Sequence, residues 1–456
     1  MTERAPHILF VLVHRHNADY FIPLAEALER RGARVSFLST DWSVQGAARR
    51  RGRAAPNVMH TRLIGQPPKR PQEGVSLENI TRYVIDNPSV DVYYLTLFAQ
   101  ADRLIRAYGQ HFDRLQPDMV VGWNGTKPEA RAAMKLAESR GIATLYFEQG
   151  NFPNTIVADP KGVNWEGSMR GFAVPREYNR ARIDEWLEAF RSRRLPAAQP
   201  SRHLAAALRV AVLDALLNFF ARRSPFHPTL YFDHEKSVSL RRFFRRVSRI
   251  LRSHFRKEAP ARAEPLDLPE PFVLLPLQVH DDTQVIVHSP RMRTMEELVD
   301  AAVTALPAGY GLVVKTHPAD EGRRRYAVIE EMLDGKRFRL VHRADTTDLI
   351  RRSSAVVTLN SSVGLEALAF MKPVVVLGDA VYAGRGITVD VADPDELPLK
   401  LSKAVRFRPD EDDVKRFLDY FVFEYSRRGS HRDPQGEDLD AMAEYVLSQR
   451  MPAQAP

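Results

Sequence analysis

The feature that most constrains the fold of this chain is a short apolar run followed at once by polar sequence. Phe272–Leu277 is apolar apart from one proline, which predicts a strand buried on both faces, as in a parallel sheet covered by helices. Polar side chains crowd into the next stretch, Gln278–Ser289. Ligands bind beyond the carboxyl ends of the strands in open α/β sheets, so we expect a functional site in this loop. The alternative is a solvated loop in which Asp281 or Asp282 caps a helix that begins near Met292.

Apolar runs alternate with helical patterns over most of the chain. Near the amino end, strands at His7–Val13 and Arg34–Leu38 flank a polar loop, His14–Asp19, and a helix at Tyr20–Arg31, which is a βαβ unit. This unit lacks the GxGxxG fingerprint, so a dinucleotide-binding start is disfavoured. Further strands are predicted at Met119–Val121, Ile142–Phe147, Gly311–Val314, Arg339–Val341, Ala355–Thr358 and Val374–Leu377. The order predicts an α/β protein with doubly wound parallel sheets.

Composition places the chain among large globular proteins. Its 456 residues, of which 44% are hydrophobic, suffice for two or three domains. Because cysteine is absent, a disulfide framework and a thiolate metal site are excluded, and a reducing cytoplasm is a compatible location. The sequence shows no uncharged apolar window long enough to span a bilayer and no signal-peptide cleavage pattern at its start.

The positive charge is concentrated in one segment. Arg191–Arg262 holds seventeen Lys and Arg against four Asp and Glu, a local charge of +13, so the rest of the chain carries −4 of the total +9. Within it, residues 238–257 combine an aromatic and aliphatic stripe with an Arg-rich face, the pattern of a helix on an anionic membrane surface. The alternative is an arm that packs its stripe on the protein. A nucleic-acid partner is disfavoured, because no recognition motif accompanies the charge.

Polar motifs also follow the later predicted strands. Lys315 and His317 come after Gly311–Val314 and suit a phosphate or carboxylate, although Lys-x-His-Pro is also compatible with a structural turn. Ala355–Thr358 leads into a small-residue turn, a helix start and Glu366. Helix N-terminal amides bind phosphate, and a glutamate there can reach ribose hydroxyls. The sequence therefore predicts a nucleotide-phosphate site, with the glycine-rich loop 378–388 beside it.

In the first half, Glu148 and Asn124 each follow a predicted strand. Both are expected to lie in the same crevice, although a surface acid at a loop entrance is the alternative for Glu148. A polar loop, 151–167, follows and contains Asn164, and long loops of this kind are often functional.

Taken in order, these motifs resemble the nucleotide-sugar half of GT-B glycosyltransferases. More narrowly, they are similar to the bacterial capsule-polysaccharide biosynthesis and export family, whose characterised members are retaining β-Kdo transferases that use CMP-Kdo. The resemblance covers about Asp118 to Asp390. The matching segments are Glu148-Gln-Gly150, Gly162-Val-Asn164, Gln278-Val-His-Asp-Asp282, Lys315-Thr-His-Pro318, Asn360-Ser-Ser-Val-Gly-Leu-Glu-Ala-Leu368, Lys372-Pro373 and Tyr382-Ala-Gly384-Arg-Gly386-Ile-Thr388.

The resemblance implies a GT-B fold, with two Rossmann-like domains facing across a cleft and a basic helical insertion. On this interpretation residues 1–190 form the acceptor-side domain and 191–265 the basic insertion. Residues 266–400 form the nucleotide-sugar domain, and 401–456 are helices that cross the domain junction.

The resemblance also implies roles for individual residues. Asp282 is the expected nucleophile in a double displacement with retention, Gln278 belongs to the catalytic set, and Glu148 is the expected general base. The substrate-binding residues are expected to be Lys315, His317, Asn360, Ser361, Ser362, Gly364 and Glu366 for the nucleotide, Tyr382, Gly384 and Thr388 around the donor, and Asn164 on the acceptor side. We expect no obligatory metal or other cofactor, since a CMP sugar carries an activated phosphate and no Asp-x-Asp cluster lies near the donor loops.

The implied activity is transfer of Kdo to a lipid or glycan acceptor by a cytoplasmic protein bound to the inner face of the cytoplasmic membrane, with a capsule assembly complex as a possible partner. Two alternatives stay open. One is a CDP-glycerol-type phosphotransferase on the same architecture. The other is a non-catalytic component of capsule assembly or export, tethered by the basic segment.

Overall fold

The computed structural model describes residues 4–40, 42–58, 75–87, 94–193, 267–280, 282–318, 326–342 and 344–449, together with Val212, Phe244, Val247 and Ser248. The predicted basic insertion, including residues 238–257, lies almost entirely outside the described residues, as does Asp281. The chain divides into two compact units. The first contains the chain up to Ser168 and again from Ser426, and the second contains residues 169–193 and 267–425.

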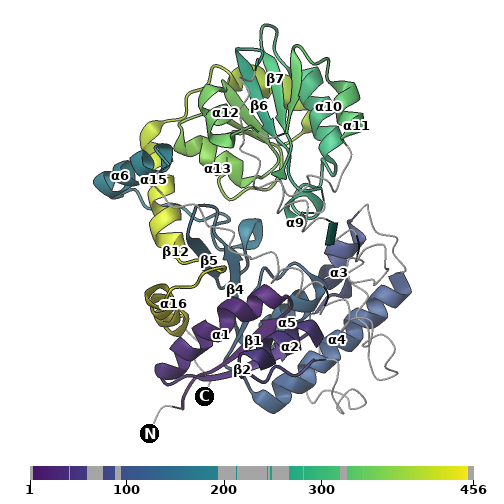
Figure 1. Ribbon diagram of the computed structural model, residues 1–456, viewed down its shortest axis with the longest axis vertical. Coiled ribbons are helices and arrows are strands. Elements are labelled where there is room, and N and C mark those ends of the chain that lie inside the picture. The colour runs from purple at the N-terminus through teal and green to yellow at the C-terminus, as the bar shows by residue number, and fades with distance from the viewer. Residues whose placement is uncertain are drawn as a thin grey trace. The chain divides into compact units, whose positions relative to one another are not determined.

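The first unit is built on a six-stranded sheet with the order β12-β5-β4-β3-β1-β2 (Figure 1). Its strands are β1 (His7–Leu12), β2 (Arg34–Ser39), β3 (Met119–Trp123), β4 (Ala143–Gln149), β5 (Thr155–Asp159) and β12 (Ser426–Arg428). The first four are parallel, whereas β5 and β12 add to the sheet in antiparallel fashion. β1 is buried along its whole length, as expected of a strand covered on both faces.

Helices cover both faces of this sheet. One core cluster joins it to α1 (Arg15–Arg30), α2 (Trp42–Arg50) and α16 (Gly436–Ser448). The other joins it to α3 (Leu77–Ile85), α4 (Tyr94–Leu115) and α5 (Pro128–Ser139). The loop predicted at His14–Asp19 is wrong, because α1 begins at Arg15. The side-chain oxygen of Asn17 accepts from the backbone N–H groups of Val13 and His14 at 3.1 and 2.7 Å, so the helix can start within polar sequence.

The second unit has a fully parallel sheet with the order β11-β10-β9-β6-β7-β8. Its strands are β6 (Phe272–Pro276), β7 (Gly311–Lys315), β8 (Phe338–Val341), β9 (Ala355–Thr358), β10 (Val374–Val376) and β11 (Val389–Asp390). From β6 the chain proceeds to β7 and β8, then returns to the other side of β6 as β9. The strand order therefore reverses between β6 and β9, which is where open α/β sheets bind ligands.

Helices of the second unit lie on both sides of its sheet (Figure 1). α10 (Met295–Ala305), α11 (Ala327–Met332) and α14 (Leu397–Ala404) share a core with one face. The remaining helices are α6 (Arg180–Arg191), α9 (Thr283–Ile286), α12 (Thr346–Arg352), α13 (Ser362–Ala369) and α15 (Glu411–Asp419), which continues into a π-helix at Tyr420–Tyr425. The predicted α/β class with two Rossmann-like, parallel-rich sheets is confirmed.

The unit boundaries differ from the predicted domain limits of 190, 265 and 400. α6 joins the second unit because Arg182 pairs with Asp419 at 2.8 Å and Asp184 pairs with Lys415 at 2.7 Å. β12 and α16 instead complete the sheet and core of the first unit. These ion pairs and strand pairings join segments more than 200 residues apart, which sequence pattern alone does not reveal. In the described part of the chain, no helix has the length and apolar character needed to cross a bilayer.

Candidate functional site at the switch point of the second sheet

A buried amide pair joins the two loops that leave β6 and β9. The side-chain nitrogen of Gln278 donates to the side-chain oxygen of Asn360 at 2.9 Å. Asn360 Nδ2 in turn lies 2.9 Å from the carbonyl oxygen of Gln284 and 3.2 Å from that of His288. Both amides are nearly inaccessible to solvent, and buried amides of this kind fix loop conformation when their hydrogen bonds are satisfied. The loop that carries Asp282 is thus fastened to the turn that begins α13.

Asp282 is the N-cap residue of α9. Its Oδ1 accepts from the backbone N–H of Gln284 at 2.9 Å and lies 3.4 Å from the Thr283 hydroxyl. The carboxylate is partly exposed, so capping fixes its orientation without burying it. The capping that sequence analysis raised as an alternative is therefore present, although on the short helix α9 and not on the helix that begins at Met295.

Lys315 and Glu366 form an electrostatic group with Asp345, the N-cap residue of α12. Burial lowers the pKa of Lys315, and the nearby charges of Asp345 and Glu366 oppose that change. Burial raises the pKa of Glu366 to about 7, Lys315 acts to lower it, and Asp345 acts to raise it further. The Glu366 side chain keeps some solvent exposure, yet neighbouring atoms surround it closely enough that its ionisation is costly. This group couples one cation and two carboxyls at the carboxyl edge of the sheet.

The turn before α13 already uses some of the amides that were predicted to hold phosphate. Ser361 N donates to the Thr358 hydroxyl and Val363 N donates to the Ser361 hydroxyl, both at 3.2 Å. Ser362 is the first residue of the helix. A phosphate at this terminus would therefore have to replace the Ser361 cap to reach the Val363 amide.

Tyr382 supports this turn from within the protein. Its side chain is buried, its hydroxyl donates to the carbonyl oxygen of Ser361 at 2.7 Å, and burial raises its pKa well above the usual range. Gly364 is required beside it, because a Cβ at that position would overlap the Tyr382 hydroxyl. Tyr382 thus holds the turn in place and does not offer its hydroxyl to solvent.

Gly384 and Thr388 are held by a residue that sequence analysis did not select. Asp390 accepts from Gly384 N at 2.8 Å and from the Thr388 hydroxyl at 2.7 Å, and Gly384 has φ +72.

His317 follows β7 at the same edge as Lys315 and is partly exposed. Asp345 was also missed; in sequence its only signal is its position shortly after the strand at 338–341.

The first unit holds the other predicted site residues. Glu148, at the end of β4, accepts from Asn124 Nδ2 and from the Gln149 backbone N–H. Asn124 adopts a left-handed conformation, φ +63, which places it against Glu148. Asn164 also has a positive φ, +54, and begins a 3-10 turn. That turn is anchored by a two-point ion pair between Glu166 and Arg131 at 2.9 and 3.0 Å.

The second unit therefore brings Gln278, Asp282 and Asn360 into one connected network beside Ser361, the N-cap residue of α13. Lys315 and Glu366 form a second group at the same sheet edge. Glu148 and Asn164 belong to the first unit. The predicted catalytic and binding roles of all these residues stay predictions.

An all-parallel sheet whose connected polar residues gather at its switch point defines the second unit as a Rossmann-like α/β domain with a binding edge. Residues 118–406, more than half of the chain, match the family described as capsule polysaccharide biosynthesis protein. The chain belongs to that family.

The chain is also similar to individual proteins. The chain is 27% identical over 325 residues to the capsule polysaccharide export protein KpsS of Escherichia coli, covering 67% of this chain and 77% of KpsS. It is 28% identical over 344 residues to protein FixF of Sinorhizobium fredii, covering 74% of this chain and 67% of FixF. Among solved structures, the KpsC beta Kdo 2,4 transferase of Thermosulfurimonas dismutans aligns with a TM-score of 0.42 at 18% identity, over 72% of this chain and 87% of that one.

Proposed function

We propose that the protein is a glycosyltransferase of capsule polysaccharide biosynthesis that transfers Kdo from CMP-Kdo, with retention, to a lipid or glycan acceptor. One observation carries the proposal: the Gln278–Asn360 pair fastens the Asp282 loop to the α13 turn at the switch point. The pair supports the proposal because it ties the loop that carries the partly exposed Asp282 carboxylate to the turn proposed for the nucleotide phosphate. Family membership supports the biosynthetic context.

In the proposed reaction, the Asp282 carboxylate attacks the anomeric carbon of Kdo while the bond to the CMP phosphate breaks, and CMP leaves as the anion. The acceptor hydroxyl then attacks the same carbon, Asp282 is released as a carboxylate, and Glu148 takes the hydroxyl proton. Two inversions give net retention. Lys315 and His317 are proposed to bind the phosphate, and Glu366 the ribose.

The test is incubation of the full chain with CMP-Kdo and a panel of lipid and glycan acceptors, followed by mass spectrometry of products and of the intact protein. Asp282→Asn preserves a capping side chain but removes the nucleophile, so we expect product to fall by about a thousandfold or more. Asp410→Asn is the matched control, because the Asp410 side chain also caps a helix, α15, accepting from Asp413 N at 2.9 Å.

A mass increase of one Kdo on the wild type that is absent from Asp282→Asn would support the double displacement. An Asp282→Asn variant as active as the Asp410→Asn control would exclude Asp282 as the nucleophile and favour the CDP-glycerol-type alternative. A wild type that neither binds CMP nor consumes CMP-Kdo would favour a non-catalytic role. Membrane contact through residues 238–257 and independence from metal stay predictions.

A further inference from the structure

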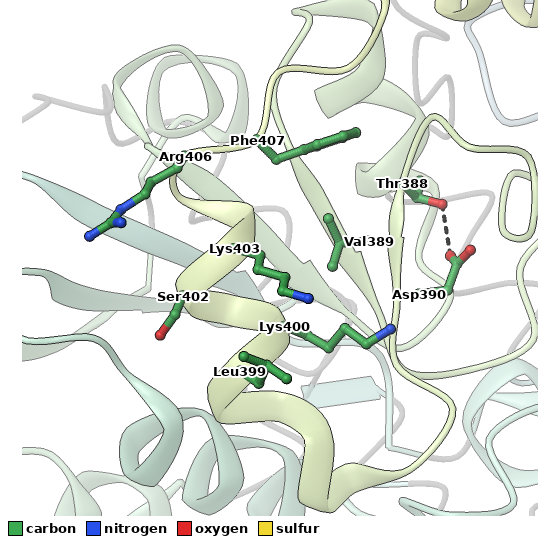
Figure 2. Close-up of a pocket in the computed structure, with 9 residues that line it drawn as sticks. All are labelled: Thr388, Val389, Asp390, Leu399, Lys400, Ser402, Lys403, Arg406 and Phe407. Carbon is green, nitrogen blue, oxygen red and sulfur yellow. Dashed lines mark hydrogen bonds between the residues drawn. The ribbon is translucent and has the colours of Figure 1, made fainter.

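A cavity in the second unit lies away from the switch point. It has a volume of about 720 Å³ and is lined by residues of β11 and its approach, of α14, and of the segment after α14 (Figure 2). That volume is within the roughly 300–1,000 Å³ range of small-ligand sites. β11 is the edge strand of the sheet, separated from β9 by β10. The cavity, here called the edge groove, therefore lies beyond the site around Asn360, and Thr388 is the one predicted donor-binding residue that lines it.

The edge groove is positively charged. Lys400, Lys403 and Arg406 all line it, and the two lysines extend from α14 toward β11 (Figure 2). Lys400 makes one long ion pair with Glu396, at 3.9 Å. Among the described residues, Lys403 and Arg406 have no acidic side chain within ion-pair distance.

Asp390 is the acidic side chain that lines the groove, and it makes no ion pair with Lys400, Lys403 or Arg406. Asp390 directs its two carboxylate oxygens to the Thr388 hydroxyl and the Gly384 backbone N–H, at 2.7 and 2.8 Å. These donors are neutral, so Asp390 keeps its negative charge and offsets one of the three positive charges of the lining. The groove is left with an excess of cationic donors that suit carboxylate or phosphate groups.

Apolar surface lies beside the cations. Val389, Leu399 and Phe407 contribute to the lining, and Figure 2 shows Phe407 and Val389 on the same side as the lysine side chains. A ligand with anionic groups on a partly apolar body matches this combination, and a sugar ring that bears a carboxylate has that character. A bilayer is a poorer match, because membrane-interface helices present several large apolar side chains, whereas Leu399 is the only such lining residue that is strongly exposed.

We propose that the edge groove binds a carboxylate-bearing saccharide segment, with Lys400 and Lys403 pairing with its carboxylates and Phe407 and Val389 contacting its ring faces. The inference does not depend on the proposed transfer chemistry, since binding needs no donor. Because Asp390 connects the groove wall to Gly384, an occupied groove would also stabilise the end of the glycine-rich loop.

The probe is tetragalacturonate, with maltotetraose as the uncharged comparison, titrated into the full chain by calorimetry at 50 and 200 mM salt. We expect tetragalacturonate to bind and maltotetraose not to bind, with weaker binding at high salt because exposed charges are screened. Lys400→Ala/Lys403→Ala is expected to weaken binding about tenfold or more. Lys336→Ala/Arg339→Ala makes the same charge change at β8, the opposite edge of the sheet, and should leave binding unchanged.

Hydrogen exchange locates the contact. Tetragalacturonate should slow exchange in peptides covering residues 388–390 and 397–407 of the wild type, and a thermal melt verifies that both double variants fold. The proposal is overturned by absence of binding at millimolar probe, by equal losses in the two double variants, or by slowed exchange confined to other segments. It is also overturned if the Lys400→Ala/Lys403→Ala variant loses affinity for phosphatidylglycerol vesicles but not for the saccharide. CMP binding, measured in parallel, reports on the proposed function separately.

Discussion

Glu366 carries a cost of ionisation that should appear as a pH-dependent stability. Its pKa is about 7 in the folded protein, raised from 4.5 mainly by burial. A carboxyl with a raised folded pKa stabilises the fold fully below its unfolded pKa and loses that contribution as pH rises through the folded value. Glu366→Gln removes the ionisation. We therefore expect the free energy of unfolding of the variant, relative to that of the wild type, to be about 2 kcal/mol higher at pH 8.5 than at pH 4, after allowance for partial exposure.

Denaturant unfolding at pH 4, 6, 7 and 8.5 measures this difference, with Glu331→Gln, an exposed residue of α11, as the control. The advantage of Glu366→Gln should develop between the two pKa values, from about pH 4.5 to 7. A difference from wild type that is equal at every pH would contradict the burial of Glu366.

At the same scale, sequence identified most of the switch-point residues but not how they are used. Gln278 and Asn360 were selected because each follows a buried strand, yet they bond to each other. The residue type and its place after a strand do not reveal such pairing, because either side-chain amide could equally well contact a ligand. Sequence analysis did not select Asp390, whose carboxylate accepts hydrogen bonds from a backbone N–H and a hydroxyl group of its own loop.

At the scale of elements, α13 and the glycine-rich loop depend on the contact between Gly364 and Tyr382. A methyl group at Gly364 would overlap the buried Tyr382 hydroxyl, and overpacking of this kind costs about 1–3 kcal/mol. We therefore expect Gly364→Ala to lower the thermal midpoint by several degrees. Adding Tyr382→Phe, which removes the hydroxyl, should recover part of the loss in a double-mutant cycle.

The control for that cycle is Gly436→Ala, at the start of α16, where a Cβ would meet no atom within 4 Å. It should be neutral or slightly stabilising, because alanine loses less backbone entropy than glycine on folding. If Gly364→Ala unfolds at the same temperature as Gly436→Ala, the turn has room to relax and Tyr382 does not fix it.

The elements that sequence predicted are those with a strong local pattern. β1, β6, β7 and β9 are short, fully buried apolar runs, and such runs are distinctive in a parallel sheet. β5 and β12 were missed. They pair with each other although they lie more than 260 residues apart, and β12 consists of Ser-Arg-Arg, which has no strand pattern of its own. Long-range pairing, and not local propensity, makes β12 a strand. β5 has β-branched residues and also pairs with the nearby β4.

For the molecule as a whole, the chain leaves the second unit at Tyr425 and returns to complete the first. β12 pairs with β5, and α16 packs on α1 through a buried stripe that includes Leu439, Met442, Ala443 and Val446. The Tyr445 hydroxyl also donates to the carbonyl oxygen of Ala158 at 2.9 Å. The stability of the first unit should therefore depend on the carboxyl-terminal segment of the chain, whereas the stability of the second unit should not.

Met442→Asp tests this dependence, because it buries a charge in the α1–α16 contact, where Met442 is 1% exposed. An unpaired buried charge costs several kcal/mol, a large share of the roughly 5–15 kcal/mol that stabilises a typical domain. We expect faster hydrogen exchange in α1, β5 and α16, and unchanged exchange in β6, β7 and β9. Ala441→Asp introduces the same charge on the adjacent, exposed position of the helix and should leave both units as in the wild type. Faster exchange in the second unit on Met442→Asp, or equal effects of the two substitutions, would mean that α16 does not belong to the core of the first unit alone.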